Sequence, residues 1–295
     1  MPTLPASEVS RTRLIPIAAM VALWTPAMIA ASHEWSHGIY YDYGWIVPPV
    51  ALWLLIRRWN DLDGEVRLPG RWTVMGWILL LIPWFTLLRV LGLVDPSWRM
   101  PIGLCGLTAA LVTHGLIART RSWRASCGFL WITLFLASAL PLPSAVELRL
   151  VQAFTHSVVV TASQWFHLAG KPVEVVGDLL LLNGFTVEVA EGCSGVRSFQ
   201  SFLMATWLFA ELQRLSATRT LILLVFAVGA AFLVNVSRAY ILAGISFSQG
   251  REGFERAHDA VGLAAFLVSA ALFYLFSAML AKRRARHLVK SVQSS

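Results

Sequence analysis

Residues 220–243 read TLILLVFAVGAAFLVNVSRAYILA, a run that is long and apolar enough to cross a bilayer as a helix. A transmembrane helix needs roughly 20 mostly apolar residues, with a lower limit of about 17. This run nevertheless contains Asn235 and Arg238 close to its end. Charged groups near hydrocarbon are costly and are usually functional. The stretch therefore predicts a membrane-spanning helix that contains a functional side chain.

The rest of the chain has the same character, since 57% of its 295 residues are hydrophobic and only 14% are charged. Such a composition excludes a soluble domain and predicts an all-α, polytopic membrane protein of about eight transmembrane helices. The eight apolar segments are 14–31, 44–56, 74–93, 101–118, 127–141, 195–212, 220–243 and 260–281. We expect a single transmembrane domain over 1–295. The first segment is expected to be retained rather than cleaved as a signal peptide, and Pro48-Pro49 interrupts the second.

The basic residues predict the orientation. Most of the 24 Lys and Arg residues lie before segment one, in alternate loops, or in the tail 282–295. By the positive-inside rule these regions and both termini are cytoplasmic. The net charge of +8 therefore indicates topology rather than nucleic-acid binding. The expected location is the inner membrane of a bacterium, in contact with membrane lipids.

The longest connection, 142–192, is expected on the extracytoplasmic side. Residues 144–168 have helical apolar spacing and predict an amphipathic helix in the membrane interface. Asn183-Gly184 stands between the apolar runs 179–182 and 185–189, which predicts a β-hairpin because Asn-Gly favours two-residue turns. The chain then leads into the sixth segment through Cys193.

Cys193 is the candidate nucleophile. A helix N-terminus or a nearby cation lowers a thiol pKa, and free backbone N–H groups at such a turn can hold an oxyanion. The adjacent Gly192 and Gly195 allow a substrate backbone to approach. The alternative is a buried, inert thiol, which is the simplest interpretation of Cys105 and Cys127.

Two further residues are expected at the same membrane face. Arg238 could stabilise negative charge, and Asn235 lies on its helical face three residues earlier. His258 begins the eighth segment and is the natural general base. Taken alone, Arg238 could snorkel to the interface, and His258 could be interfacial. Within the fourth segment, His114 is expected to form an interhelical hydrogen bond.

Three blocks resemble the exosortase/archaeosortase family: residues 189–198 (VAEGCSGVRS), Asn235-x-x-Arg238, and His258 with Gly262. The likeness extends to Ser36-His37-Gly38, to 46–49 (IVPP), and to the eight-segment layout. His258 at the third position resembles the bacterial exosortase branch. Because the chain ends soon after the eighth segment, the extra C-terminal domain that some bacterial members have is not expected.

The resemblance implies a membrane-embedded cysteine transpeptidase or protease. Its substrates would be exported proteins that end in a short sorting motif, a transmembrane helix and a basic cluster. Cys193 would attack the scissile carbonyl, Arg238 would stabilise the oxyanion or hold the substrate, and His258 would act as base and acid. Supporting or substrate-binding residues would be Glu191, Ser194, Gly195, Arg197 and Asn235. No cofactor or metal is expected.

Two other functions remain open. Residues 33–37 (HEWSH) match H-E-x-x-H, in which His33 and His37 could bind zinc while Glu34 activates water. No third ligand stands out, and interfacial His and Trp side chains are the favoured interpretation. The other alternative is a non-catalytic subunit of an exopolysaccharide export or assembly machine. Replacing Cys193 by Ser distinguishes these functions, because only a cysteine transpeptidase would lose its activity.

Overall fold

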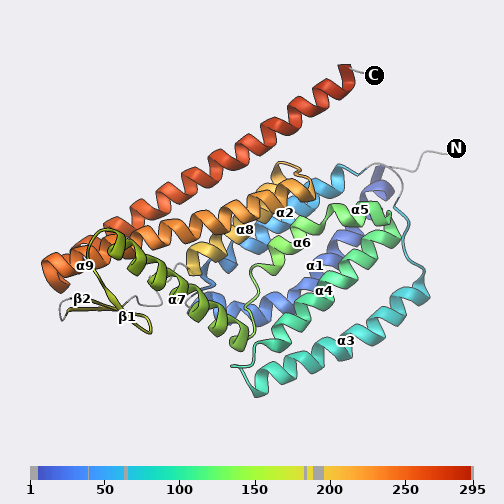
Figure 1. Cartoon of the computed structure of the whole chain (residues 1–295). Helices are drawn as coiled ribbons and strands as arrows, with labels where there is room; N and C mark the ends of the chain where they lie inside the picture. Colours follow the sequence, from blue (N-terminus) through green and yellow to red (C-terminus); the bar gives the residue numbers. More distant parts are fainter. Residues whose placement is uncertain (1–5, 39, 63–65, 183–184, 189–195, 294–295) are drawn as a thin grey trace. The chain divides into compact units, whose positions relative to one another are not determined.

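The computed structural model contains nine α-helices and three short strands among the residues that it describes (Figure 1). The described residues are 6–38, 40–62, 66–182, 185–188 and 196–293. The chain divides into two compact units, Met1–Val146 and Glu147–Ser295, and each is described by itself. The prediction of a single domain over 1–295 stays a prediction.

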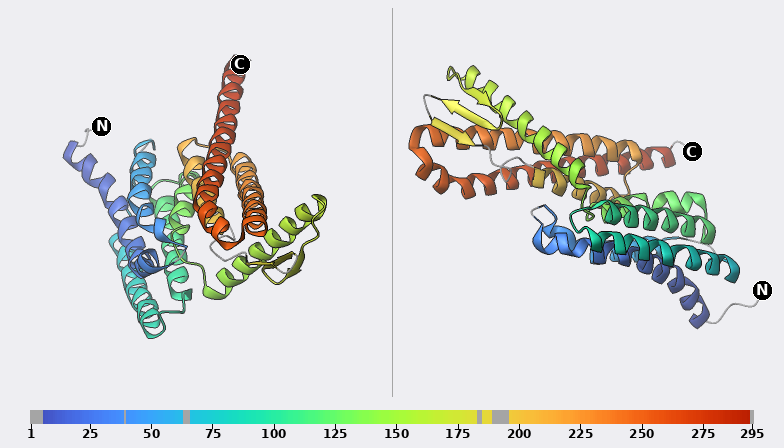
Figure 2. Two further views of the ribbon diagram at one scale, coloured as in Figure 1. Left: turned by 90° about the vertical axis from the view of Figure 1, so that its left-hand side faces the viewer. Right: turned by 90° about the horizontal axis from the view of Figure 1, so that it is seen from below.

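The first unit is a bundle of helices in which α4 packs against both α1 and α3 (Figures 1 and 2). Its smaller helices α2 and α6 pack against each other. The elements are α1 (Ala6–His37), the 3-10 turn η1 (Asp42–Trp45), α2 (Val47–Asn60), α3 (Arg71–Val94), α4 (Met100–Thr120), α5 (Trp123–Gly128) and α6 (Leu130–Ala137).

Polar side chains link the helices of this unit. The Trp24 indole of α1 donates to the Thr113 hydroxyl of α4 at 3.2 Å. His114, the next residue of α4, contacts Ser126 through Nδ1 at 2.9 Å and Thr133 through Nε2 at 3.1 Å. Hydrogen bonds of this kind fix helices side by side where apolar packing alone is not selective. The predicted interhelical role of His114 is confirmed.

A tight connection joins α3 to α4. Asp95 accepts hydrogen bonds at its Oδ1 from the Ser97 hydroxyl (2.5 Å) and from the Ser97 backbone N–H (3.0 Å). These bonds, led by the one from the hydroxyl, lower the pKa of the Asp95 carboxyl. Ser144 donates to the Ser97 carbonyl at 2.9 Å. These hydrogen bonds therefore fix the connection between the end of α3 and the start of α4.

The second unit is built around α9 (Ala217–Gln293), which reverses direction at Gly250 (Figure 1). We call residues 217–249 the outgoing arm and residues 251–293 the return arm. Gly250 has φ 70° and ψ −166°, a conformation that is essentially restricted to glycine. The rings of Phe226 and Phe276 stack at 3.9 Å between the arms. A single glycine therefore turns one long apolar segment into a helical hairpin.

The helix α7 (Ser144–Leu168) packs along the outgoing arm, and its first residues belong to the first unit. Val158 and Ala162 of α7 form a buried cluster with Val236 and Ala239 of α9. The predicted helix over 144–168 is confirmed. Its position in the membrane interface stays a prediction.

A small antiparallel sheet follows α7 and lies beside the reversal of α9 (Figures 1 and 2). Its strands are β1 (Glu174–Val176), β2 (Leu179–Leu182) and β3 (Phe185–Glu188), in the order β1-β2-β3. Leu180 is buried in a cluster with Phe166 of α7 and Ala243 of α9. The β2–β3 register pairs Leu182 with Phe185. Because residues 183–184 lie outside the described residues, the Asn-Gly turn type stays a prediction.

Four helices in the described residues are long and apolar enough to cross a membrane. They are Leu14–His37, Arg71–Val94, Met100–Thr120 and Ala217–Lys282. The last has 66 residues and includes the reversal at Gly250, so it is long enough for two crossings. The chain is thus an α-helical membrane protein. The other segments form shorter helices, such as α2 with 14 residues and α8 (Val196–Leu212) with 17, and eight crossings stay a prediction.

Candidate functional site

Arg238 and His258 meet across the two arms of α9. Arg238 Nη2 lies 3.0 Å from His258 Nε2. A guanidinium can only donate hydrogen bonds, so Nε2 accepts. His258 Nδ1 lies 3.0 Å from Asp259 Oδ1, which accepts a proton held on Nδ1. A neutral imidazole with its proton on Nδ1 satisfies both contacts.

The side chains of Arg238, His258 and Asp259 differ in their exposure to solvent. The Asp259 side chain is 99% exposed and the His258 side chain is 35% exposed. An exposed ion pair or charged hydrogen bond contributes little energy, so Asp259 orients the ring weakly. Arg238 is half-buried, and its buried Nε makes no hydrogen bond within the described part of the chain. The guanidinium therefore keeps a donor for a further acceptor.

Gly262 makes room for the guanidinium. It lies one helical turn after His258, and a Cβ at this position would be 3.3 Å from Arg238 Nη2 and 3.5 Å from its Cζ. The nearer distance is tighter than ordinary van der Waals contact. A side chain at position 262 would therefore have to push the guanidinium aside.

Asn235 is 5% exposed and lies one turn before Arg238 on the outgoing arm. Its neighbour Val236 is fully buried against α7. Contact with α7 thus fixes the rotation of the outgoing arm about its axis. With the arm fixed in this way, Asn235 and Arg238 occupy one face of the helix.

The helix α8 packs against the return arm and runs in the same direction. The rings of Phe202 and Phe273 lie with their centroids 5.5 Å apart. Gln213, directly after the end of α8 at Leu212, donates to Ser277 at 3.4 Å. These two contacts hold α8 beside the arm that carries His258.

The remaining candidates divide into two groups. Arg197 lies in the first turn of α8 and is exposed. Outside the described residues lie Glu191, Cys193, Ser194 and Gly195. The other two cysteines are free thiols, with Cys105 buried and Cys127 exposed.

The H-E-x-x-H segment is helical up to His37, where α1 ends. The rings of His33 and His37 stack with their centroids 4.8 Å apart. Glu34 is paired with Arg99, with 3.1 Å from Nε to Oε1 and 2.8 Å from Nη2 to Oε2. Within the described residues no three His, Cys, Asp or Glu side chains gather as metal ligands. Both oxygens of the supposed water-activating carboxylate are therefore bound to a guanidinium.

Replacing Glu34 by Gln is expected to destabilise the first unit. The two side chains of the Glu34–Arg99 pair are only 14% and 19% exposed, so losing the carboxylate leaves a largely buried cation and costs about 1–3 kcal/mol. The measurement is the apparent Tm of the purified protein in detergent. Glu255→Gln is the matched control, because the Arg251–Glu255 side chains are 91% and 61% exposed. An equal fall in Tm for both variants would contradict the stabilising role of the Glu34–Arg99 pair.

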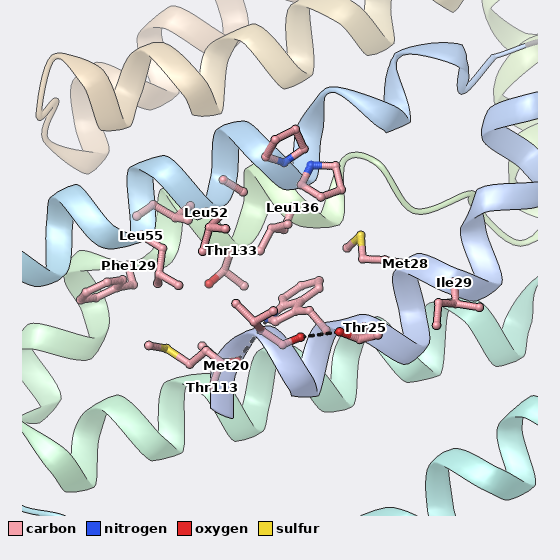
Figure 3. Close-up of a pocket in the computed structure, with 16 residues that line it drawn as sticks. Met20, Thr25, Met28, Ile29, Leu52, Leu55, Thr113, Phe129, Thr133 and Leu136 are labelled. Carbon is pink, nitrogen blue, oxygen red and sulfur yellow. Dashed lines mark hydrogen bonds between the residues drawn. The ribbon is translucent and has the colours of Figure 1, made fainter. Parts of the chain in front are cut away.

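An apolar cavity of about 290 Å³ lies between α1, α2, α4 and α6 (Figure 3). Met20, Met28, Leu52 and Leu136 line it, together with Pro48 and Pro49 at the start of α2. Its lining includes no titratable side chain. The cavity therefore provides apolar space but no reacting group.

Sequence comparison assigns the family. The family described as transmembrane exosortase (Exosortase_EpsH) matches residues 35–275, a region that includes Arg238 and His258. Neither a curated protein nor a solved structure matches the chain. Because the match covers most of the sequence, the chain belongs to the transmembrane exosortase family.

Proposed function

We propose that the protein is a membrane-embedded cysteine transpeptidase or protease that removes a C-terminal sorting signal from exported proteins. Family membership supports a transpeptidase-like role in the membrane. The observation that carries the finer proposal is the 3.0 Å contact between Arg238 and His258. It joins a potential oxyanion donor to a potential base. Cys193 precedes α8, which packs against the same return arm, by three residues in the sequence.

In the proposed reaction, His258 Nε2 takes the proton of the Cys193 thiol and the thiolate attacks the scissile carbonyl carbon. Arg238 stabilises the negative charge that develops on the carbonyl oxygen. The peptide C–N bond then breaks, His258 returns the proton to the leaving amine, and a thioester to Cys193 remains. Water or an amine acceptor releases the substrate by attacking this thioester.

The geometry of the Arg238–His258 pair adds a condition to this reaction. In the free protein, the lone pair of His258 Nε2 accepts a hydrogen bond from Arg238. The imidazole can accept the thiol proton only after the guanidinium has turned away. A substrate carbonyl that attracts Arg238 would free Nε2 at the same moment. We therefore infer that substrate binding activates the base.

The proposed orientation places this chemistry outside the cytoplasm. Arg214 lies between α8 and α9 and Arg219 lies in the first turn of α9, at the end of the outgoing arm away from Arg238. By the positive-inside rule that end is cytoplasmic. The sorting signal's basic cluster would stay on the same side, so its transmembrane helix would hold the motif at the level of Arg238 and His258. The proposed location is the bacterial inner membrane, with the site facing the periplasm.

Co-expression with a candidate substrate tests the proposal. An exported protein with a motif, a helix and a basic cluster at its C-terminus is produced with the wild type or with Cys193→Ala, and the mature C-terminus is measured by mass spectrometry. Loss of the tail with the wild type alone is the expected result. The mass of the new end distinguishes hydrolysis from transfer.

Two other results would point to other functions. An intact tail with both enzymes, across candidate sorting motifs, would favour an accessory subunit of an export machine. Tail loss with both enzymes would implicate another protease. His33→Ala then tests the H-E-x-x-H segment directly.

A side chain at position 262 is expected to reduce processing. Gly262→Val would displace the guanidinium from His258 and from the substrate, and we expect a loss of about 10-fold to 100-fold, less than deletion of the oxyanion donor itself. Gly229→Ala is the control on the same helix, because a Cβ there meets nothing within 4 Å. Rates of tail removal for the two variants provide the test; a Gly262→Val enzyme as fast as Gly229→Ala would mean that the close packing against Arg238 is dispensable.

A further inference from the structure

A second cavity, of about 780 Å³, opens at one end of the first unit. Its walls come from the last turns of α1 and α3 and from the first turns of α4, three helices that lie side by side (Figure 1). The volume lies within the usual range for small-molecule sites. None of its lining residues belongs to the proposed peptidase site.

The cavity is polar at one end and apolar at the other. His33 and Ser36, from the last turn of α1, line the polar end, together with Trp45 of η1. Pro26 and Ile29, two turns earlier in α1, line the apolar end. Along α1 the distance from Ile29 to Ser36 is about 10 Å. A ligand that fits both ends must be amphiphilic.

Arg89 gives this cavity a positive charge. It lies in α3 about 7.5 Å before the end of that helix at Val94, and it lines the cavity. Glu34 is the acidic residue of the lining, and its charge is already neutralised by Arg99. Within the described residues, Arg89 has no hydrogen bond or ion pair with a carboxylate. The cavity therefore has an excess positive charge, which is carried by Arg89 of the membrane-spanning helix α3.

Such a charge usually marks a functional site. Within the first unit, the α3 helix presents a mostly uncovered apolar surface. Thr25 and Ile29 line both this cavity and the apolar cavity of Figure 3. Apolar walls thus extend from Arg89 towards the middle of α1. This arrangement matches a lipid whose headgroup lies near the helix ends and whose acyl chains extend towards the middle of α1.

We propose that this cavity binds one anionic phospholipid, with its phosphate on Arg89 and its acyl chains against the apolar wall of α1. Guanidinium–phosphate hydrogen bonds are among the stronger charge-assisted contacts. Trp45 and Trp98, at 56% and 47% exposure, flank the headgroup level, where Trp is typically enriched. The inference does not depend on the proposed peptidase chemistry.

Lipid titration of the purified full-length protein tests the site. Native mass spectrometry in detergent gives the Kd for phosphatidylglycerol, with phosphatidylcholine as the neutral probe. We expect the wild type to prefer phosphatidylglycerol and Arg89→Gln to bind it about 10-fold or more weakly. Arg71→Gln is the matched control. Arg71 lies on the same helix about 27 Å away, stacked over Trp72 at 5.2 Å, and its loss should leave the Kd unchanged.

A second variant tests the cavity without changing the charge. Gly92 lines the cavity, and a Cβ there would meet Pro101 only at 3.9 Å, an ordinary contact. Gly92→Leu is therefore expected to fold, to occupy the lipid's space and to weaken phosphatidylglycerol binding about 10-fold. The melting temperature of each variant verifies its folding.

Three results would overturn the proposal. The first is an unchanged Kd in both Arg89→Gln and Gly92→Leu. The second is an equal loss in Arg71→Gln, which would indicate general attraction of anionic lipid to basic surface. The third is displacement of the lipid by glycerol phosphate at comparable concentration, because the site would then recognise a free phosphate rather than a lipid.

Discussion

Replacing Cys193 by Ala is expected to lower the rate of tail removal by at least about 1,000-fold, because the proposed acyl-enzyme forms on the Cys193 thiol. A nucleophile contributes through a covalent bond, so its loss cannot be offset by the oxyanion donor or by the base. The measurement is the initial rate of conversion of a co-reconstituted substrate. Cys193→Ser should be nearly as inactive, since a hydroxyl needs a stronger base than a thiol.

The other two cysteines are the matched controls for this variant. Cys105 is buried at 4% exposure and Cys127 is exposed. Both lie in the first unit, whereas Arg238 and His258 lie in the second, so Cys105→Ala and Cys127→Ala should retain nearly the full rate. Full activity of Cys193→Ala would exclude the cysteine mechanism, whatever the controls show.

Arg238→Gln is expected to lower the rate of tail removal by about 100-fold to 1,000-fold, the usual cost of deleting one oxyanion donor. The amide keeps a donor but lacks the positive charge and the fork of the guanidinium. Arg238→Lys keeps the charge, yet it offers a point donor in place of the fork and should recover only a small part of the rate. The loss should fall on kcat more than on KM if Arg238 acts in the transition state.

Arg256→Gln provides the comparison for Arg238. Arg256 is exposed on the return arm, two residues before His258, and its Nε donates to the Glu252 carbonyl at 3.3 Å. Its loss removes one positive charge near the site without touching the imidazole. Equal slowing of Arg256→Gln and Arg238→Gln would show that general positive charge, rather than the placed guanidinium, is what matters.

Much of the fold could be predicted because apolar length and periodicity are local properties of the sequence. The helix over 144–168 is an example, since its boundaries follow from spacing alone. The break between α5 and α6 at Phe129 could not be predicted in this way. The short helix α6 packs against α2, and tertiary packing of this kind leaves no periodic signal in the sequence.

The candidate site residues could be named from the sequence, but their contacts could not. Motif spacing identifies Arg238 and His258, while the reversal at Gly250 that brings them to 3.0 Å depends on one positive φ. Asp259 was missed because an exposed acid beside a histidine is an ordinary surface feature. The partner of Glu34 was missed as well, although a lone acid at the end of an apolar segment is a signal that a cation should lie nearby.

Capture of the thioester tests the central claim most directly. Purified enzyme is mixed with a substrate that carries the motif, the helix and the basic cluster, quenched in acid, and analysed by mass spectrometry of the intact protein and of its peptides. The account predicts an adduct of the substrate's N-terminal part on the peptide containing Cys193, removed by hydroxylamine and absent in Cys193→Ala. Tail removal without any such adduct at Cys193, or with an adduct on another residue, would contradict it.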